Sequence, residues 1–133
     1  MMSDMTISFD DVLVAILYTM REEKRCRITT DRRKLHEAFF ALKREFPQLL
    51  GELTFRNRGF FPESDILDQA IANLEGSSLM HRKNQDPVYY ELEPSINTSF
   101  DLFVKRRLEE CEFQQGDAKQ MADYVWDKIK YGS

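Results

Sequence analysis

Apolar side chains recur every three or four residues along several stretches of this chain, a pattern that predicts amphipathic helices. A first helix is expected over about residues 10–25 and a second over about residues 30–46, where Thr29 or Thr30 can act as the N-cap and Pro47 limits the end. The short segment 26–28 between them has strand character. The apolar faces of the two helices predict four core residues: Leu13, Leu17, Phe39 and Leu42.

The stretch PESDILDQAIANLEG, residues 62–76, carries the clearest helical pattern in the chain. Pro62 suits a first-turn position, Ser64 can cap the helix, and Gly76 suits the residue just past its end. Before this helix, residues 52–61 alternate weakly and are expected to be extended, with a bend near Gly59. The apolar stripe of the helix predicts four further core residues: Ile66, Leu67, Ile71 and Leu74.

Two β-rich runs, SLMHR and VYYEL, follow this helix and stand on either side of residues 83–87. They predict a hairpin that pairs residues near 79–82 with residues near 88–91. Two more helices are expected after Pro94, the first capped by Asn97, Thr98 or Ser99 and broken at Gly116, the second capped by Asp117.

Three helices followed by a two-stranded wing make a winged helix-turn-helix, and here two C-terminal helices are added to it. The expected fold class is therefore mostly α with a small β-hairpin (α+β). We expect residues 1–133 to form a single winged-helix-like domain, with a core over about 10–95 and a C-terminal helical extension over about 97–131. Extensions of this kind are places where dimers are often built.

The segment LTFRNRGFFPESDILDQAIANLEGSSLMHR resembles the Panacea antitoxin-domain group and related winged-helix proteins. In that group a turn of the type Gly-Pro-aromatic-Ser precedes a helix, which is followed by an aliphatic residue and a strand. The leading helix with Leu17 and Tyr18 has a counterpart there, and the similarity covers about residues 10–92. Here Phe60 and Phe61 separate Gly59 from Pro62, so the turn differs from that of the family. The resemblance implies a winged-helix fold and carries over no functional residue.

The composition is that of an ordinary globular domain, with 42% hydrophobic residues, 32% charged residues and a formal net charge of −4. The longest apolar run, residues 12–20, is shorter than the roughly 20 residues that cross a bilayer. Acidic residues precede this run, where a signal peptide has basic ones. We therefore expect a cytoplasmic protein with no membrane partner, in which Cys26 and Cys111 are free thiols.

The sequence contains no phosphate-binding loop, nucleophile elbow, His-Glu-x-x-His pair or dinucleotide fingerprint. His36 and His81 have no second His or Cys at metal-ligand spacing. The simplest interpretation places His36 on a polar helix face and His81 on the surface of the wing. We therefore predict a protein that is not an enzyme, with no catalytic residue, no metal site and no cofactor.

Charge is distributed unevenly along the chain. Residues 21–34 hold seven basic and three acidic side chains, a net charge of +4, whereas residues 63–75 hold four acidic side chains and no basic one. The helix before the wing normally enters the DNA major groove, and the phosphates would repel an acidic helix. The residues that we consider as nucleic-acid contacts lie instead in the basic segment and the wing: Arg25, Arg27, Arg32, Arg33, Arg82 and Lys83. The alternative interpretation of the basic segment is a solvated helix boundary.

Aromatic residues are more numerous than the apolar stripes require. Neighbours in an extended segment point to opposite faces, so one member each of the pairs Phe60–Phe61 and Tyr89–Tyr90 is expected to leave the core. Part of the following set is expected at a protein interface: Phe100, Phe103, Met121, Tyr124 and Trp126. Coverage by the added helices is the alternative for these residues.

Two functional hypotheses result from these patterns. The leading one is a non-enzymatic, regulatory interaction module that binds a protein partner or itself as a dimer. The alternative is a DNA-binding transcriptional regulator that contacts phosphates through residues 21–34 and the wing.

Overall fold

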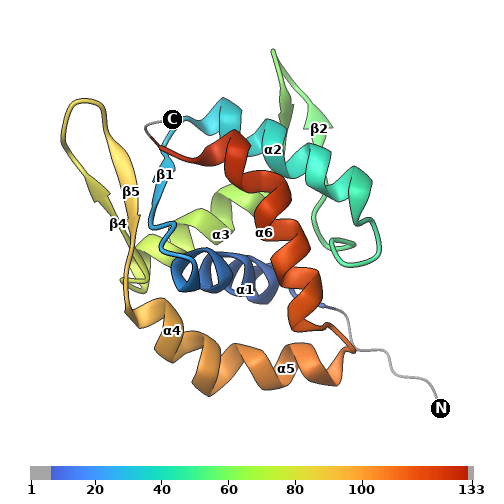
Figure 1. Ribbon diagram of the computed structural model, residues 1–133. Helices are drawn as coiled ribbons and strands as arrows, with labels where there is room; N and C mark the ends of the chain where they lie inside the picture. The colour runs from blue at the N-terminus through green and yellow to red at the C-terminus, as the bar shows by residue number, and fades with distance from the viewer. Residues whose placement is uncertain (1–6, 132–133) are drawn as a thin grey trace.

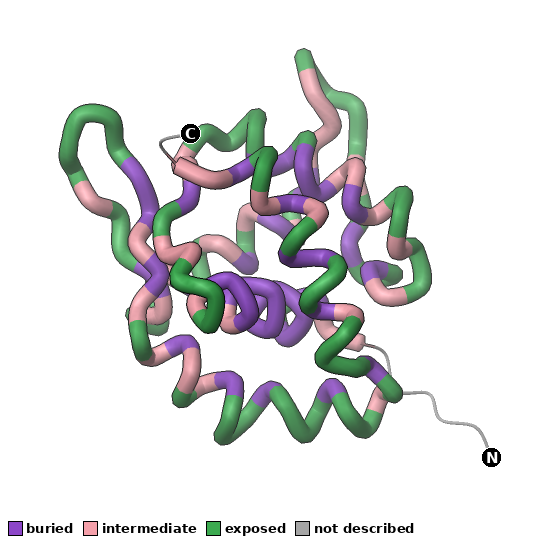
Figure 2. The backbone as a smooth tube through the Cα atoms, in the orientation of Figure 1, coloured by how far each residue is buried: buried purple, intermediate pink, exposed green. Residues whose placement is uncertain are grey.

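Helix α1 (Phe9–Glu22) forms the centre of the fold because it is apolar on almost every side. A computed structural model of the chain describes residues 7–131. In it, every residue from Asp11 to Leu17 is buried, and Figure 2 shows α1 as an almost continuously buried helix in the middle of the molecule. A helix that is hydrophobic all round needs cover on all sides. The other helices provide that cover.

One side of α1 is covered by three helices, α2 (Arg32–Glu45), α3 (Asp65–Gly76) and α6 (Gln115–Ile129) (Figure 1). The other side is covered by residues 95–110, which we call the arm. The arm runs without interruption through α4 (Ser95–Ser99), the π-helical turn η1 (Phe100–Val104) and α5 (Lys105–Glu110). Helix α6 contributes five buried residues to the same core as α1: Ala118, Met121, Ala122, Val125 and Ile129.

The β part is small and antiparallel. Strands β1 (Arg27–Thr29), β4 (Met80–Lys83) and β5 (Tyr89–Leu92) form a sheet in the order β1-β5-β4. The predicted hairpin is confirmed, with Met80 opposite Leu92 and Lys83 opposite Tyr89, and its loop, residues 84–88, lies one residue later than expected. The predicted strand at 26–28 is confirmed as β1. A second hairpin, β2 (Arg56–Asn57) with β3 (Pro62–Glu63), forms where an extended segment with a bend was expected.

Six of the eight predicted core residues are buried: Leu13, Leu17, Phe39, Leu42, Leu67 and Leu74. Ile66 and Ile71 are only half-buried, because they lie at the flank of the α3 stripe and pack against the edge of the core. The apolar pattern therefore identified the helix faces correctly and overestimated the width of the buried face of α3.

The N-cap of a helix differs from the predicted one where several residues that can act as N-cap are adjacent in the sequence. Asp31 caps α2 in place of Thr29 or Thr30, and its carboxylate accepts hydrogen bonds from the backbone N–H groups of Arg33 and Lys34. Ser64 caps α3 as predicted, with its hydroxyl accepting from the N–H of Leu67.

The remaining boundaries also shift. Pro62 lies in β3 rather than in the first turn of α3, and Gly76 is the last residue of α3. Helix α4 begins at Ser95, ahead of the expected caps at 97–99. Helix α6 begins at Gln115 behind a reciprocal cap between Gln114 and Asp117, so the helix continues through Gly116 instead of starting after it.

Candidate interaction surface

The outer face of the arm exposes two neighbouring large apolar side chains. Leu102 is 67% exposed and Phe103 is 58% exposed. The opposite face packs on the core through residues that recur every fourth position: Ile96, Phe100, Val104 and Leu108. A regular helix has 3.6 residues per turn, so a four-residue repeat drifts around its axis. The wider π-helical turn reduces this drift and keeps the buried stripe against the core.

The arm is fastened to α1 by specific contacts. Arg107 donates through Nε and Nη2 to the two carboxylate oxygens of Asp11, at 2.9 and 2.8 Å. The side chain of Asp11 is only 12% exposed, and its hydrogen bonds raise the pKa of Arg107 above its ordinary value. The ring of Tyr18 stacks on Phe100 with the centroids 4.1 Å apart. Leu102 and Phe103 are therefore presented by a helix that is held in place.

The predicted interface residues divide into three groups. Phe100 and Met121 are buried in the core of the chain, which is the alternative considered for this set. Tyr124 and Trp126 are half-buried, each with a cation over its ring: Lys128 Nζ lies 4.4 Å from the Tyr124 centroid and Arg25 Cζ 5.5 Å from that of Trp126. Phe103 is exposed, as an interface residue must be.

Five of the six predicted nucleic-acid contacts form ion pairs within the chain: Arg25 with Asp123 at 2.8 Å, Arg27 with Glu91 at 3.4 Å, Arg32 with Asp68 at 2.6 Å, Arg33 with Glu37 at 3.0 Å and Arg82 with Glu75 at 3.8 Å. The sixth, Lys83, ends β4 beside the exposed loop 84–88. A phosphate would have to compete with a carboxylate at each of the five arginines. The positive charge of the basic segment is largely compensated inside the fold.

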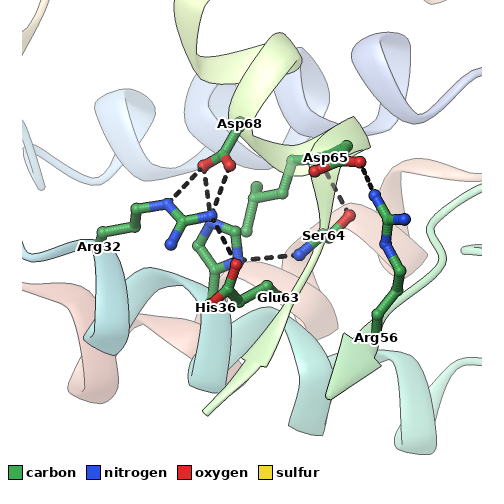
Figure 3. A network of polar contacts seen from close by, with 8 residues as sticks. Arg32, His36, Arg56, Glu63, Ser64, Asp65 and Asp68 are labelled. Atoms are coloured by element: carbon green, nitrogen blue, oxygen red, sulfur yellow. Dashed lines mark hydrogen bonds and ion pairs between the residues drawn. The ribbon is translucent and has the colours of Figure 1, made fainter. Parts of the chain in front are cut away.

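The acidic helix α3 is compensated in the same way (Figure 3). Arg32 of α2 donates through Nε and Nη2 to Asp68 at 3.0 and 2.6 Å and reaches Glu63 at 3.4 Å. Arg56 of β2 pairs with Asp65. Burial alone would raise the pKa of Asp68, but the hydrogen bonds from Arg32 and from His36 outweigh it and hold this pKa below its ordinary value.

His36 is fully buried, so the prediction of a polar-face position was wrong. The backbone N–H of Ser64 donates to Nδ1 of His36 at 3.0 Å, and therefore Nδ1 carries no proton. Nε2 then bears the proton and donates to Asp68 at 2.8 Å. Ser64, His36 and Asp68 do not form a nucleophilic triad, because the Ser64 hydroxyl caps α3 and the imidazole is closed off from solvent. His36 thus joins α2 to Asp68 of α3 and to Ser64, the residue between β3 and α3 (Figure 3). His81 lies on the surface of β4, as expected.

A groove of about 370 Å³ lies between α1, the arm and the start of α6. Its apolar lining consists of Tyr18, Phe100, Leu108 and Phe113, and its polar lining of Glu22, Asp101, Lys105, Glu109 and Gln115. Burial raises the pKa of the Tyr18 hydroxyl, and the negative charges of Glu22 and Asp101 raise it further.

The two aromatic pairs behave differently. Phe60 is 95% exposed at the tip of the second hairpin, while Phe61 is half-buried and packs against His36. Tyr89 and Tyr90 are both buried, so the prediction that one of them leaves the core was wrong. Both faces of β5 are covered, since the Tyr89 ring packs on Tyr131 with the centroids 4.5 Å apart.

Sequence reasoning missed Leu102 and the Asp11–Arg107 pair. Leu102 could have been found from the sequence, because it falls midway between Phe100 and Val104 in the four-residue apolar repeat of the arm, at a position where the core needs no apolar residue. Nothing local connects Asp11 with Arg107, because their contact depends on how the arm returns to α1.

Within residues 7–131, no group of three or more His, Cys, Asp and Glu side chains is placed to hold a metal ion. The helices of this part of the chain are too short or too polar to cross a membrane. Comparison of the chain with models of protein families, with curated proteins and with solved structures finds no match. The resemblance to the Panacea group therefore stays a prediction from the sequence.

Proposed function

We propose that this chain is a winged-helix-like, non-enzymatic interaction module with a regulatory role, and that it binds a protein partner or a second copy of itself through the outer face of the arm. The observation that carries this proposal is the exposure of Leu102 and Phe103, 67% and 58%, on a helix that is fastened to the core. Adjacent exposed apolar side chains on an ordered element are typical of binding surfaces, and aromatic residues such as Phe103 are enriched at the centre of protein interfaces.

The winged-helix part of the proposal is supported by the order of the elements. Helix α1, strand β1, helices α2 and α3, and the hairpin β4–β5 follow one another as a winged helix requires, and β1 pairs with the second strand of the hairpin. Two features are additions to that plan. The hairpin β2–β3 is inserted between α2 and α3, and α6 packs along α1 and α2.

The second candidate is a DNA-binding regulator. Lys83 beside the exposed loop 84–88 favours it, because this is where a wing meets the phosphate backbone. The ion pairs of Arg25, Arg27, Arg32, Arg33 and Arg82 count against it, as does the net charge of −4. A mobility-shift assay with random duplex DNA at low salt separates the two candidates, since the interaction module should give no shift.

The proposal is tested with the double variant Leu102→Ser, Phe103→Ser. Light scattering over a wide concentration range measures self-association, and a photo-crosslinking residue at position 102 in a cell extract reports a heterologous partner. The expected result is an assembly or a specific crosslink that the double variant loses. Phe60→Ser removes a side chain that is more exposed and belongs to the β2–β3 hairpin, which lies far from the arm in Figure 1, so it should leave the association unchanged.

The proposal is wrong if the unaltered chain keeps the mass of a monomer, 15.8 kDa, at every concentration and also gives no crosslink that depends on position 103. Circular dichroism of the double variant ensures that a lost association does not result from unfolding. Exposed side chains contribute little to stability, so the variant should fold normally.

A further inference from the structure

The groove between α1, the arm and α6 combines two kinds of lining that suit a cation. The half-buried ring of Tyr18, backed by the buried Phe100 on which it stacks, provides aromatic surface, and Glu22, Asp101 and Glu109 provide three carboxylates. The volume of about 370 Å³ falls in the range of roughly 300–1,000 Å³ that ligand sites occupy. Aromatic rings next to carboxylates attract cations both through the ring quadrupole and through charge.

We infer that this groove binds an arginine side chain of a basic segment in a partner protein. That the arginine belongs to a protein rests on the proposed function. Arginine suits the site better than lysine, because its planar guanidinium group stacks on aromatic rings and offers several N–H donors to separate carboxylates. The occupant is opposite in charge to the groove, whose lining holds three acidic side chains and one basic side chain, Lys105, a net charge of −2.

The carboxylates are not equally free to bind. Glu22 already accepts a hydrogen bond from Nδ2 of Asn97 at 3.0 Å, which fixes its position and leaves further acceptor capacity on its two oxygens. Asp101 and Glu109 are exposed residues of the arm. Gln115 donates to the hydroxyl of Thr19 at 2.9 Å and so forms part of the fixed wall. Asp101 and Glu109 are therefore the residues whose charge can be removed with the least effect on the fold.

The groove and the exposed pair belong to the same arm. Asp101 lines the groove and directly precedes Leu102 in the π-helical turn, whereas Leu102 and Phe103 lie outside the lining. A segment that carries an apolar residue next to an arginine would use both features at once. The expected partner surface is therefore basic and apolar rather than acidic.

The inference is tested with two acetylated and amidated peptides. One alternates arginine and leucine, and the other has citrulline in place of arginine, which keeps the shape and removes the charge. Near physiological salt, fluorescence anisotropy should show the arginine peptide binding at least about tenfold more tightly. In amide NMR spectra the largest shifts should appear at Tyr18, Asp101 and Phe113.

Variants of the groove make the assignment specific. Asp101→Asn combined with Glu109→Gln should bring the two peptides to within about twofold of each other, since two of the three carboxylates are lost. Lys105→Gln should increase the affinity for the arginine peptide, an effect that a merely structural role of the groove would not produce. Glu45→Gln removes an exposed carboxylate at the end of α2 and should change nothing.

Equal binding of the two peptides, or shifts that map outside the groove, would overturn the inference. So would an arginine preference that survives the combined Asp101 and Glu109 variant. If Leu102→Ser, Phe103→Ser still abolishes association in that case, the proposed function stands and only the cation assignment fails. If the groove prefers arginine while that double variant leaves association unchanged, the inference stands and the proposed function fails.

Discussion

Replacing Asp68 with alanine should destabilise the fold far more than an exposed acidic residue normally would. The reason is the His36 imidazole, which is fully buried and donates its Nε2 proton to Asp68. Without the carboxylate this donor is buried without an acceptor, which costs about 1–3 kcal/mol. The pair with Arg32 adds about 0–1 kcal/mol, because both side chains are partly exposed and solvent screens them. The expected loss is therefore about 1–4 kcal/mol.

Urea unfolding, followed by circular dichroism and by the fluorescence of Trp126, measures this loss. Asp65→Ala is the matched variant, since Asp65 belongs to the same helix and pairs with Arg56 at the surface. Its loss should not exceed about 1 kcal/mol. A loss below about 0.5 kcal/mol for Asp68→Ala, or one equal to that of Asp65→Ala, would show that His36 does not depend on Asp68.

The difference between the unaltered chain and Asp68→Ala should also depend on pH. The pKa of Asp68 is lowered from its ordinary value of 3.8, so folding favours the charged form. The contribution of its charge is then fully present above about pH 4 and is lost as the pH falls through the pKa of the folded state. Unfolding measured between neutral pH and pH 3 should show the difference shrinking only at the acidic end.

Three further outcomes are expected. Leu67→Ala, at a fully buried position, should cost about 2–5 kcal/mol in chemical denaturation, and a loss under about 0.5 kcal/mol would show that α3 does not pack as described. Arg107→Ala should lower the free energy of unfolding by about 1–3 kcal/mol, because Asp11 loses both hydrogen bonds. Arg106→Ala, at a side chain that is 89% exposed, should lower it by less than about 0.5 kcal/mol. Equal losses for the two variants would contradict the role of Arg107 in holding the arm against α1. Asp65→Lys should strengthen non-specific DNA binding in a low-salt mobility-shift assay and should leave the His36 contacts intact. Tight, sequence-specific binding by the unaltered chain that is lost on replacing Asp65 would favour the DNA-binding alternative.

The features that could be predicted from the sequence are those encoded by neighbouring residues. The helical repeats, the Ser64 cap, the β1 strand and the β4–β5 hairpin each depend on spacing and turn residues within a short window. The burial of His36 does not. His36 stands at the flank of the apolar face of α2, and only the approach of β3 and Asp68 makes that flank an interior position.

Charge counts were a poor guide to the surface for a related reason. The sequence shows that residues 21–34 are basic and residues 63–75 acidic, but it does not show that Arg32 and Asp68 face each other. Arg27 and Arg25 likewise meet Glu91 and Asp123, which lie far along the chain. Tertiary pairing converts two charged segments into compensated ones, and this counts against the basic segment as a phosphate-binding surface.

The position of α6 has a consequence for the order in which the chain can fold during synthesis. Helix α1 leaves the ribosome before α6, which covers one of its sides. The bridge between Ile28 and Lys130 likewise joins β1 to a residue made about a hundred positions later. Until α6 arrives, the nascent chain exposes apolar surface of α1 and leaves one edge of β1 unpaired, which is the state in which chaperones bind and chains aggregate. The core around α1 is therefore completed only after α6 has been made, and not by the helices that precede it.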